Sequence, residues 1–553
     1  MLSFSPPFLS RATYVNLAIY YSLFWVLKWL LKPIYWFSPL RNIPGPSSPS
    51  WFKGNLGQLF NAKGLPFHRD LVDRYGGMVR VYGFFGDEQL YISDPRALQS
   101  ILVQEQDAYD ETSVFVETNK VIFGPGLVAT TGEIHKRQRK LVAPIFSPSN
   151  LRDLVPTFYD VAERLCDVLI HETESRVGAD GRSILDMSDW ISRASLETAG
   201  KAILGYSFDP LDSPVTNTYT HAIRELIPTL FSLSLVRQFA PFLVRLGPAW
   251  ARRRLVEWTP NAAVQKVKGM SDVMHERASS ILASARAAEA GKGARAKDII
   301  SLLLRANANA RPGEELSEAE LTGQMTVLIF GAQDTSSSAL SRILYMLATR
   351  PDIQHKMRQE LRAATSDTSD ARLNVEQISA LPWLDAILKE TMRLCADRNR
   401  ALAERTIPFT DLSGSVSSVT IPRGTTLFLG IAGANRLPSV WGADATEWKP
   451  ERWQGHPQHK IESSVRLPGI YAGMMSFLGG RRSCIGYKFA EIELKILLVA
   501  LVSRFEFSAT QDEIVWNLSQ IISPSVQSVK EGSTVEEKGL PLYVRRIEES
   551  GRA

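Results

Sequence analysis

The residues best suited to chemistry form a short run around one cysteine. Phe477 to Gly486 reads F-L-G-G-R-R-S-C-I-G and matches F-x-x-G-x-R-x-C-x-G at every fixed position. At average composition, such a match would arise by chance in about one of ten thousand chains of this length. A cysteine thiolate can hold iron, glycines permit close backbone approach, and an arginine can bind a carboxylate. We therefore predict that Cys484 ligates haem iron, with Arg482 on a haem propionate and Phe477 beside the sulfur.

A second chemical group lies inside a predicted long helix, Leu321 to about Thr349. This helix should begin at a capping box, because Ser317 is followed three residues later by Glu320. Midway, Gly331–Ser336 reads G-A-Q-D-T-S. Asp and Thr are unfavourable within helices because their side chains compete for backbone hydrogen bonds. Asp334 and Thr335 could instead relay protons, although the segment taken alone also fits a polar helix face.

Charged side chains form two further patterns. Glu390-Thr391-Met392-Arg393 matches E-x-x-R, which occurs about once or twice by chance in a chain of this length and could be a plain helical ion pair. Pro450-Glu451-Arg452-Trp453 follows downstream, and the segment G-E-I-H-K-R-Q-R, residues 132–139, carries His135 and Arg139.

In kind and order, these segments resemble the cytochrome P-450 family over nearly the whole chain. The resemblance implies a mainly α fold with small β-sheets and a haem-thiolate monooxygenase activity. It implies haem b as cofactor, O2 as oxidant, and NADPH-derived electrons from a reductase, with cytochrome b5 as an optional donor. It also implies residue roles: Glu390, Arg393 and Arg452 in folding and haem retention, His135 and Arg139 on a propionate, and Asp334 and Thr335 in proton delivery.

The chain departs from the family pattern in three places. Ala332 stands where the family usually has glycine, and His135 stands where it has tryptophan. The third departure is Cys395–Ala401, C-A-D-R-N-R-A, which is shortened and charged compared with the family's pocket-lining turn. Arg398 or Arg400 could serve the second propionate or, alternatively, hold the carboxylate of an acidic substrate.

Composition excludes several other classes of protein. With 553 residues, 44% hydrophobic and 22% charged, the chain is globular, and a net charge of +5 without basic clusters argues against nucleic acid as a partner. Three cysteines suit a reducing compartment, with Cys166 and Cys395 as small buried apolar residues. There is no G-x-S-x-G, P-loop, H-E-x-x-H or Rossmann glycine motif, so the electrons must come from a separate protein.

The N-terminus predicts the location. Tyr14–Leu31 is an 18-residue, mostly apolar stretch that as a helix would span roughly 27 Å, close to the hydrocarbon core of the endoplasmic reticulum. We expect a single-pass anchor over 1–32, a Pro-rich hinge over 33–50, and a cytosolic catalytic domain over 51–553. A cleaved signal peptide is the alternative, but Lys32-Pro33 and aromatic residues follow in place of a small-residue cleavage site.

The remaining elements frame these motifs. Residues 78–83 and 89–93 alternate around a Gly86-Asp87 turn and predict a β-hairpin, helices should dominate from about 96 to 395, and 285–296 should be a flexible connection. The helical segment H-K-R-Q-R resembles the corresponding segment in fungal members of the family, many of which act on secondary metabolites. We expect a lipophilic, terpenoid-like or polyketide-like substrate. A peroxide-rearranging isomerase or dehydratase and a non-catalytic haem sensor remain the alternatives.

Overall fold

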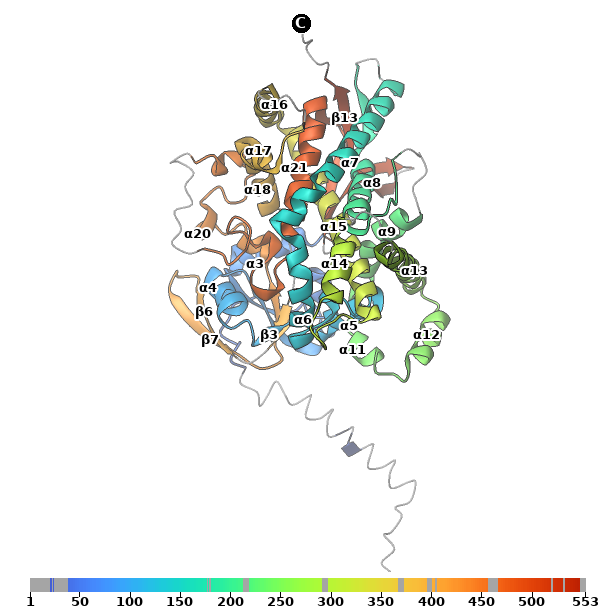
Figure 1. Cartoon of the computed structure of the whole chain (residues 1–553). Coiled ribbons are helices and arrows are strands. Elements are labelled where there is room, and N and C mark those ends of the chain that lie inside the picture. Colours follow the sequence, from blue (N-terminus) through green and yellow to red (C-terminus); the bar gives the residue numbers. More distant parts are fainter. Residues whose placement is uncertain are drawn as a thin grey trace, which may run out of the picture.

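The computed structural model describes residues 38–176, 178, 181–211, 218–290, 297–366, 372–394, 400–402, 405–455, 466–518, 521–530 and 533–547, with Tyr20, Tyr21 and Leu23. Helices make up most of this part of the chain, and small sheets lie at its edges (Figure 1). The expected mainly α architecture with small sheets is therefore confirmed.

The longest helix, α15 (Glu318–Thr349), runs through the middle of the molecule (Figure 1). Its first turn is closed by the predicted capping box: the Glu320 amide donates to Ser317 Oγ at 3.3 Å, and the Ser317 amide donates to the Glu320 carboxylate at 2.8 Å. Its end at Thr349 precedes Pro351, the first residue of α16 (Pro351–Ser366). The prediction for this helix is confirmed at both ends.

Three further helices contribute to the main hydrophobic core together with α15. They are α7 (Pro148–Ser175), α8 (Met187–Ala199) and α21 (Tyr487–Arg504). Figure 1 shows α7 and α21 side by side, with α8 beside α15. Cys166 of α7 is fully buried in this core, as expected of a small apolar side chain, and burial raises the pKa of its thiol. Cys395 lies outside the described residues.

The largest sheet has five strands in the order β1-β2-β8-β5-β3. β1 (Met78–Tyr82) and β2 (Glu88–Ile92) form the predicted antiparallel hairpin, with Met78 opposite Ile92. β8 (Thr426–Leu429) pairs in parallel with β2, and β5 (Arg400–Leu402) joins β8 to β3 (Tyr109–Asp110). This sheet brings residues near 110 and near 400 into one layer.

Three smaller sheets complete the β structure. β4 (Ser183–Asp186) and β9 (Phe505–Ala509) flank β13 (Pro541–Arg546), and β6 (Arg405–Thr410) pairs with β7 (Val416–Ile421). The third contains β10 (Glu513–Leu518), β11 (Ile522–Lys530) and β12 (Ser533–Lys538). This last sheet was not predicted, because β11 carries serines and a proline, which do not alternate like a half-buried strand.

The other helices lie around this frame. They are α2 (Leu56–Leu59), α3 (Leu65–Tyr75), α4 (Pro95–Gln99), α5 (Ser113–Phe123), α6 (Gly132–Val142), α9 (Thr218–Ser232), α10 (Ser234–Arg237), α11 (Ala240–Leu243), α12 (Ala249–Trp258), α13 (Ala262–Ala290), α14 (Ile299–Ala308), α17 (Val375–Ser379), α18 (Pro382–Leu394), α19 (Ile431–Ala434) and α20 (Pro438–Trp441). The expected flexible connection over 285–296 is wrong for 285–290. These residues continue α13 because most of them are alanine, the best helix former.

The N-terminal predictions meet the structure only in part. Most of Tyr14–Leu31 lies outside the described residues, and in the part of the chain that the structure describes no helix is long and apolar enough to cross a bilayer. The end of the predicted hinge packs on the body: Leu40 and Ile43 are buried, and the Arg80 amide of β1 donates to the Pro44 carbonyl at 2.8 Å. The globular body therefore begins before residue 51.

Candidate active site

The cysteine loop is closed by its own backbone. The Cys484 amide donates to the Phe477 carbonyl at 2.9 Å, and the Ser483 amide donates to the Gly480 carbonyl at 3.1 Å. Gly480 adopts a positive φ of 67°, and a Cβ atom there would lie 1.9 Å from the Leu102 carbonyl oxygen. This glycine is thus required by the protein's own packing, a reason that the sequence pattern did not reveal.

Two cations meet at this loop from different elements. Arg139 of α6 donates to Ser483 Oγ at 3.2 Å, and Arg482 donates to the Asp110 carboxylate of β3 at 2.6 Å. Burial lowers the pKa of the Arg139 guanidinium, while the charge of the nearby Cys484 thiolate opposes that shift. The structure therefore brings Cys484, Arg139 and Arg482 together, and it adds Asp110, which the sequence analysis missed.

His135 lies one turn before Arg139 on α6, so the two side chains share a helix face. A lone histidine is more often a surface residue, but the structure buries the His135 side chain. A buried ring close to Arg139 suits the predicted contact with a haem carboxylate, and that role stays a prediction.

A haem fits this set of donors. Cys484 is partly exposed at the N-terminal end of α21, where its thiolate can reach a metal. Two guanidinium groups stand beside it, and the buried Nε of Arg482 has no acceptor among the described residues. Phe477 packs edge-on against Tyr471, with ring centres 5.3 Å apart, and shields one side of the loop. A soft anionic ligand next to cations for two carboxylates matches an iron porphyrin.

The proton-relay segment of α15 has two different faces. Gln333 donates to Ser192 Oγ of α8 at 2.8 Å, and Ser336 donates to the Glu493 carboxylate of α21 at 2.7 Å. These two buried side chains fix the helix to its neighbours. Asp334 and Thr335 are partly exposed, and the Thr335 hydroxyl donates to the Gly331 carbonyl one turn earlier at 2.6 Å. The pair predicted to move protons thus lies on a rigidly held helix.

Glu493 is a second residue that the sequence analysis missed. Its side chain is fully buried, burial raises the pKa of its carboxyl to about 8, and its second oxygen has no hydrogen-bond partner among the described residues. A signal was present in the sequence, since a glutamate within the apolar run that follows Cys484 indicates a buried acid. At neutral pH this carboxyl is mainly protonated, and it links α21 to α15 through Ser336.

The predicted Glu-Arg-Arg group is assembled and buried. Arg393 donates to the Glu390 carboxylate at 3.0 and 2.8 Å, and Arg452 lies 3.4 Å from it. Trp453 Nε1 and the Lys449 amide each donate to the same carboxylate at 3.0 Å. All of these partners belong to α18 or to residues 449–453, the short turn and the residue before it. This saturation of hydrogen bonds suits the predicted structural role.

The charged turn before β5 is only partly placed. Arg400 begins β5 and pairs with Leu427 of β8, whereas Arg398 lies outside the described residues. Ala332, the departure from the family's glycine, is partly buried and packs against the main core. Which arginine serves a second propionate therefore stays a prediction.

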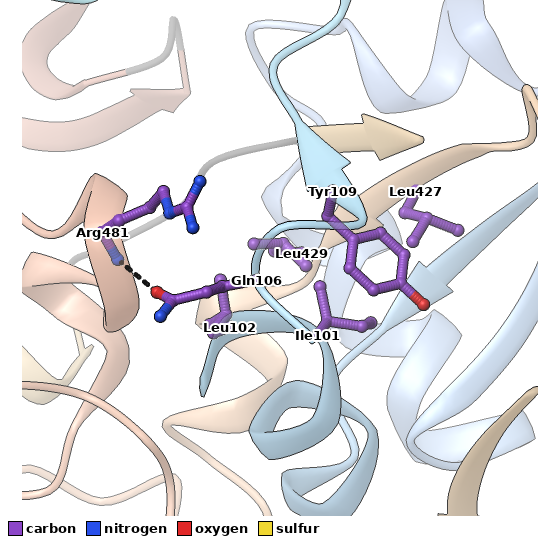
Figure 2. A pocket seen from close by; sticks show the side chains of 7 residues that line it. All are labelled: Ile101, Leu102, Gln106, Tyr109, Leu427, Leu429 and Arg481. Atoms are coloured by element: carbon purple, nitrogen blue, oxygen red, sulfur yellow. Dashed lines mark hydrogen bonds between the residues drawn. The ribbon is translucent and has the colours of Figure 1, made fainter. Parts of the chain in front are cut away.

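A small cavity lies between the cysteine loop and the large sheet. Figure 2 shows its lining, in which the Arg481 amide donates to Gln106 Oε1 at 3.2 Å and the Tyr109 hydroxyl points away from Arg481. The cavity measures about 10 Å³, which is the lower limit for one water molecule. It is far too small for a substrate.

Fold and donor set point to one class of protein: a mainly helical chain whose donor residues suit a haem bound through a thiolate. A family model for cytochrome P450 matches residues 44–527. Cytochrome P450 monooxygenase 81 of Postia placenta is 39% identical over 520 residues, covering 91% of this chain and 93% of the relative. Ganoderic acid synthetase CYP5150L8 of Ganoderma lucidum is 36% identical over 528 residues, covering 91% and 94%. The chain belongs to the cytochrome P450 family and is a P450 monooxygenase.

Proposed function

We propose that this P450 hydroxylates an unactivated carbon of a lipophilic small molecule, terpenoid-like or polyketide-like, with electrons from NADPH through a separate reductase. The carrying observation is the apolar packing between α5 and α15, two segments that by resemblance should line the pocket, where the rings of Phe123 and Phe330 lie 5.0 Å apart. Ile521, near the C-terminal end of the chain, packs against the same hydrophobic core. Such walls favour apolar ligands at roughly 25 cal/mol per Å² of buried surface.

The side chains have separate tasks in this reaction. When bound, haem would supply the oxidising chemistry, with Cys484 as the residue that would hold its iron. Arg139 and Arg482 would hold its carboxylates, and the buried Glu390 group keeps the loop in place. Asp334 and Thr335 would hold and pass on the protons that the reaction consumes, while the hydrogen bonds of Gln333 and Ser336 keep their helix in place.

The proposed location is the cytosolic face of the endoplasmic reticulum, with Tyr14–Leu31 as a single-pass anchor and a reductase and cytochrome b5 as protein partners. A membrane surface concentrates apolar substrates near the pocket. Full-length protein should resist carbonate extraction from microsomes, and a form beginning at Ser38 should be released while retaining haem. We choose Ser38 because Leu40 and Ile43 belong to the folded body. Glycosylation at Asn517, the first residue of the acceptor triplet Asn517-Leu518-Ser519, would contradict this topology. Full-length protein in the soluble fraction would contradict it too.

The name of one relative, the ganoderic acid synthetase of Ganoderma lucidum, supports a secondary-metabolite substrate. A second relative is eriI, a P450 monooxygenase of Hericium erinaceus that is 33% identical over 515 residues. Both belong to fungi, as the resemblance of the H-K-R-Q-R helix implied.

The decisive experiment incubates microsomes carrying this protein and a reductase with a panel of lipophilic metabolites, under isotopically labelled oxygen. We expect NADPH-dependent products that gain one labelled oxygen atom, detected by mass spectrometry. Microsomes with the Cys484→Ser variant provide the matched control. Turnover restricted to polar compounds, or product formation without oxygen incorporation, would overturn the proposal and favour a rearranging enzyme.

A further inference from the structure

A surface cleft lies between α5 on one side and α11 with α12 on the other. We call it the rim cleft. α11 lies against α5 in the lower part of the molecule, and α12 stands further to the right, against α13 (Figure 1). The cleft measures about 490 Å³, which is within the range of small-molecule sites. The α5 wall comes from Ser113, Glu117, Lys120 and Val121, whose spacing places them on one helix face.

The charges around the rim cleft do not balance. Lys120, Arg245 and Arg252 face a single carboxylate, Glu117. Within the described part of the chain, Lys120 and Arg245 form no ion pair, although Glu117 is three residues from Lys120 on the same helix. Arg252 donates to the Gly247 carbonyl at 2.7 Å. Two opposite walls of a hollow site thus present cations that form no ion pair with the residues that the structure describes.

The rest of the lining is apolar. Val121, Pro241 and Val244 stand beside the cations. The far side of α5 carries Phe123, which packs on Phe330 of α15. A molecule in the rim cleft therefore lies one helix away from the apolar interior, with its charged end held outside.

Arg237 of α10 is an independent observation on the same chain segment. Its guanidinium is largely buried, burial lowers its pKa to about 10, and its Nε has no acceptor among the described residues. A buried cation without a partner is costly, and an anionic ligand would offset that cost. The segment from α10 to α12 therefore carries two cations without an ion-pair partner among the described residues: Arg237, which is largely buried, and Arg245, which lines the cleft.

We propose that the rim cleft binds the carboxylate end of a lipophilic acid, with Lys120 and Arg245 as the groups that select acids over neutral analogues. The inference rests on the proposed function and names the substrate class: an apolar body that carries a carboxylate. Carboxylate and cation gain charge-assisted hydrogen bonds, while the apolar body contacts Val121 and Val244. A hollow site with cations on both walls suits a single molecule better than a flat bilayer surface.

The test measures binding, not turnover. Full-length holoprotein in phosphatidylcholine nanodiscs is dialysed against octanoate or 1-octanol, with empty nanodiscs as the blank. We expect Lys120→Gln/Arg245→Gln to weaken octanoate binding about three- to ten-fold and to leave 1-octanol unchanged, because only the charged contact is lost. Glu117→Gln should tighten octanoate binding, because it removes the one repelling charge. The double variant Arg253→Gln/Arg254→Gln removes the same charge outside the cleft and should change neither ligand.

Each other outcome overturns the inference. Equal losses of affinity for octanoate and 1-octanol would mean that the cleft binds only through apolar contacts. An equal loss of octanoate affinity in the Arg253/Arg254 control would mean that only the overall positive charge of this region matters. If the cleft variant lost affinity for vesicles containing phosphatidylserine but kept octanoate binding, the occupant would be a lipid headgroup. All of these results leave oxygen insertion into lipophilic compounds intact, so the two proposals fail separately.

Discussion

Two charged groups in this protein are organised in opposite ways. The Glu390–Arg393–Arg452 group is buried, and its carboxylate accepts hydrogen bonds from four side chains and backbone groups. The rim cleft exposes its cations, and Lys120 and Arg245 have no described carboxylate as an ion-pair partner. A buried charge without partners is unstable, so the first group must be complete before the chain is stable. Solvent-exposed charges are stable without an ion-pair partner, so the cations of the rim cleft can bind a ligand.

The largest expected effect comes from the cysteine loop, which belongs to neither of these two charged groups. Cys484→Ser should abolish the red-shifted Soret band of the reduced, carbon-monoxide-bound protein, because a hydroxyl does not replace a thiolate ligand. The difference spectrum of microsomes checks this prediction. Cys166→Ala is the matched control and should retain the band, since Cys166 only fills the core. A normal spectrum in Cys484→Ser would remove the assignment of the iron ligand.

Neutralising one glutamate in each region sharpens the comparison. Glu390→Gln should destabilise the fold by about 3–5 kcal/mol and reduce haem retention, because the buried Arg393 guanidinium loses its counter-charge and Arg452 keeps only that of Asp444. Glu117→Gln should leave the thermal midpoint unchanged, because its carboxylate has no ion-pair partner in the described residues. Haem content and thermal unfolding measure both variants. Similar behaviour of the two would show that burial does not distinguish the groups.

The sequence predicted best what depends on near neighbours. The capping box at Ser317 and the hairpin around residues 86–87 are set by contacts within a few positions, and both are confirmed. The partner of Arg482 could not be predicted, because Asp110 lies 372 residues away and is brought close by β3 in the large sheet. The rim cleft was missed for the same reason: Lys120 and Arg245 look like ordinary surface cations until the fold sets them across one hollow.

Thr335 lies on the helix that fixes the interior, and its loss should affect chemistry without affecting the fold. Thr335→Ala should keep haem and substrate binding but lower product formed per NADPH by about ten-fold, with the remaining reducing equivalents released as peroxide. Parallel assays of NADPH, product and peroxide check this. Thr349→Ala is matched, because Thr349 Oγ1 also donates to the carbonyl four residues earlier, that of Tyr345. Unchanged coupling in Thr335→Ala would count against proton delivery.

The smallest predicted effect concerns Glu493, a buried acid that is stable only because it is protonated. Burial raises the pKa of its carboxyl from 4.5 to about 8, so between these values the folded state holds a proton that the unfolded state has released. Stability contributed by this group is present below about pH 4.5 and is lost as the pH rises through about 8. For a chain of this size, the thermal midpoint should fall by about 1 °C per pH unit across that window.

Glu493→Gln should flatten that dependence, because an amide mimics the protonated acid and still accepts from the Ser336 hydroxyl. Glu506→Gln is the control. Glu506 is a partly exposed acid on β9 that pairs with Arg545, and its replacement should leave the slope in place. Midpoints measured from pH 5 to pH 8 for the three proteins decide the matter. An unchanged slope in Glu493→Gln would mean that the acid ionises within the fold, and that a buried charge can persist here without the partners that Glu390 requires.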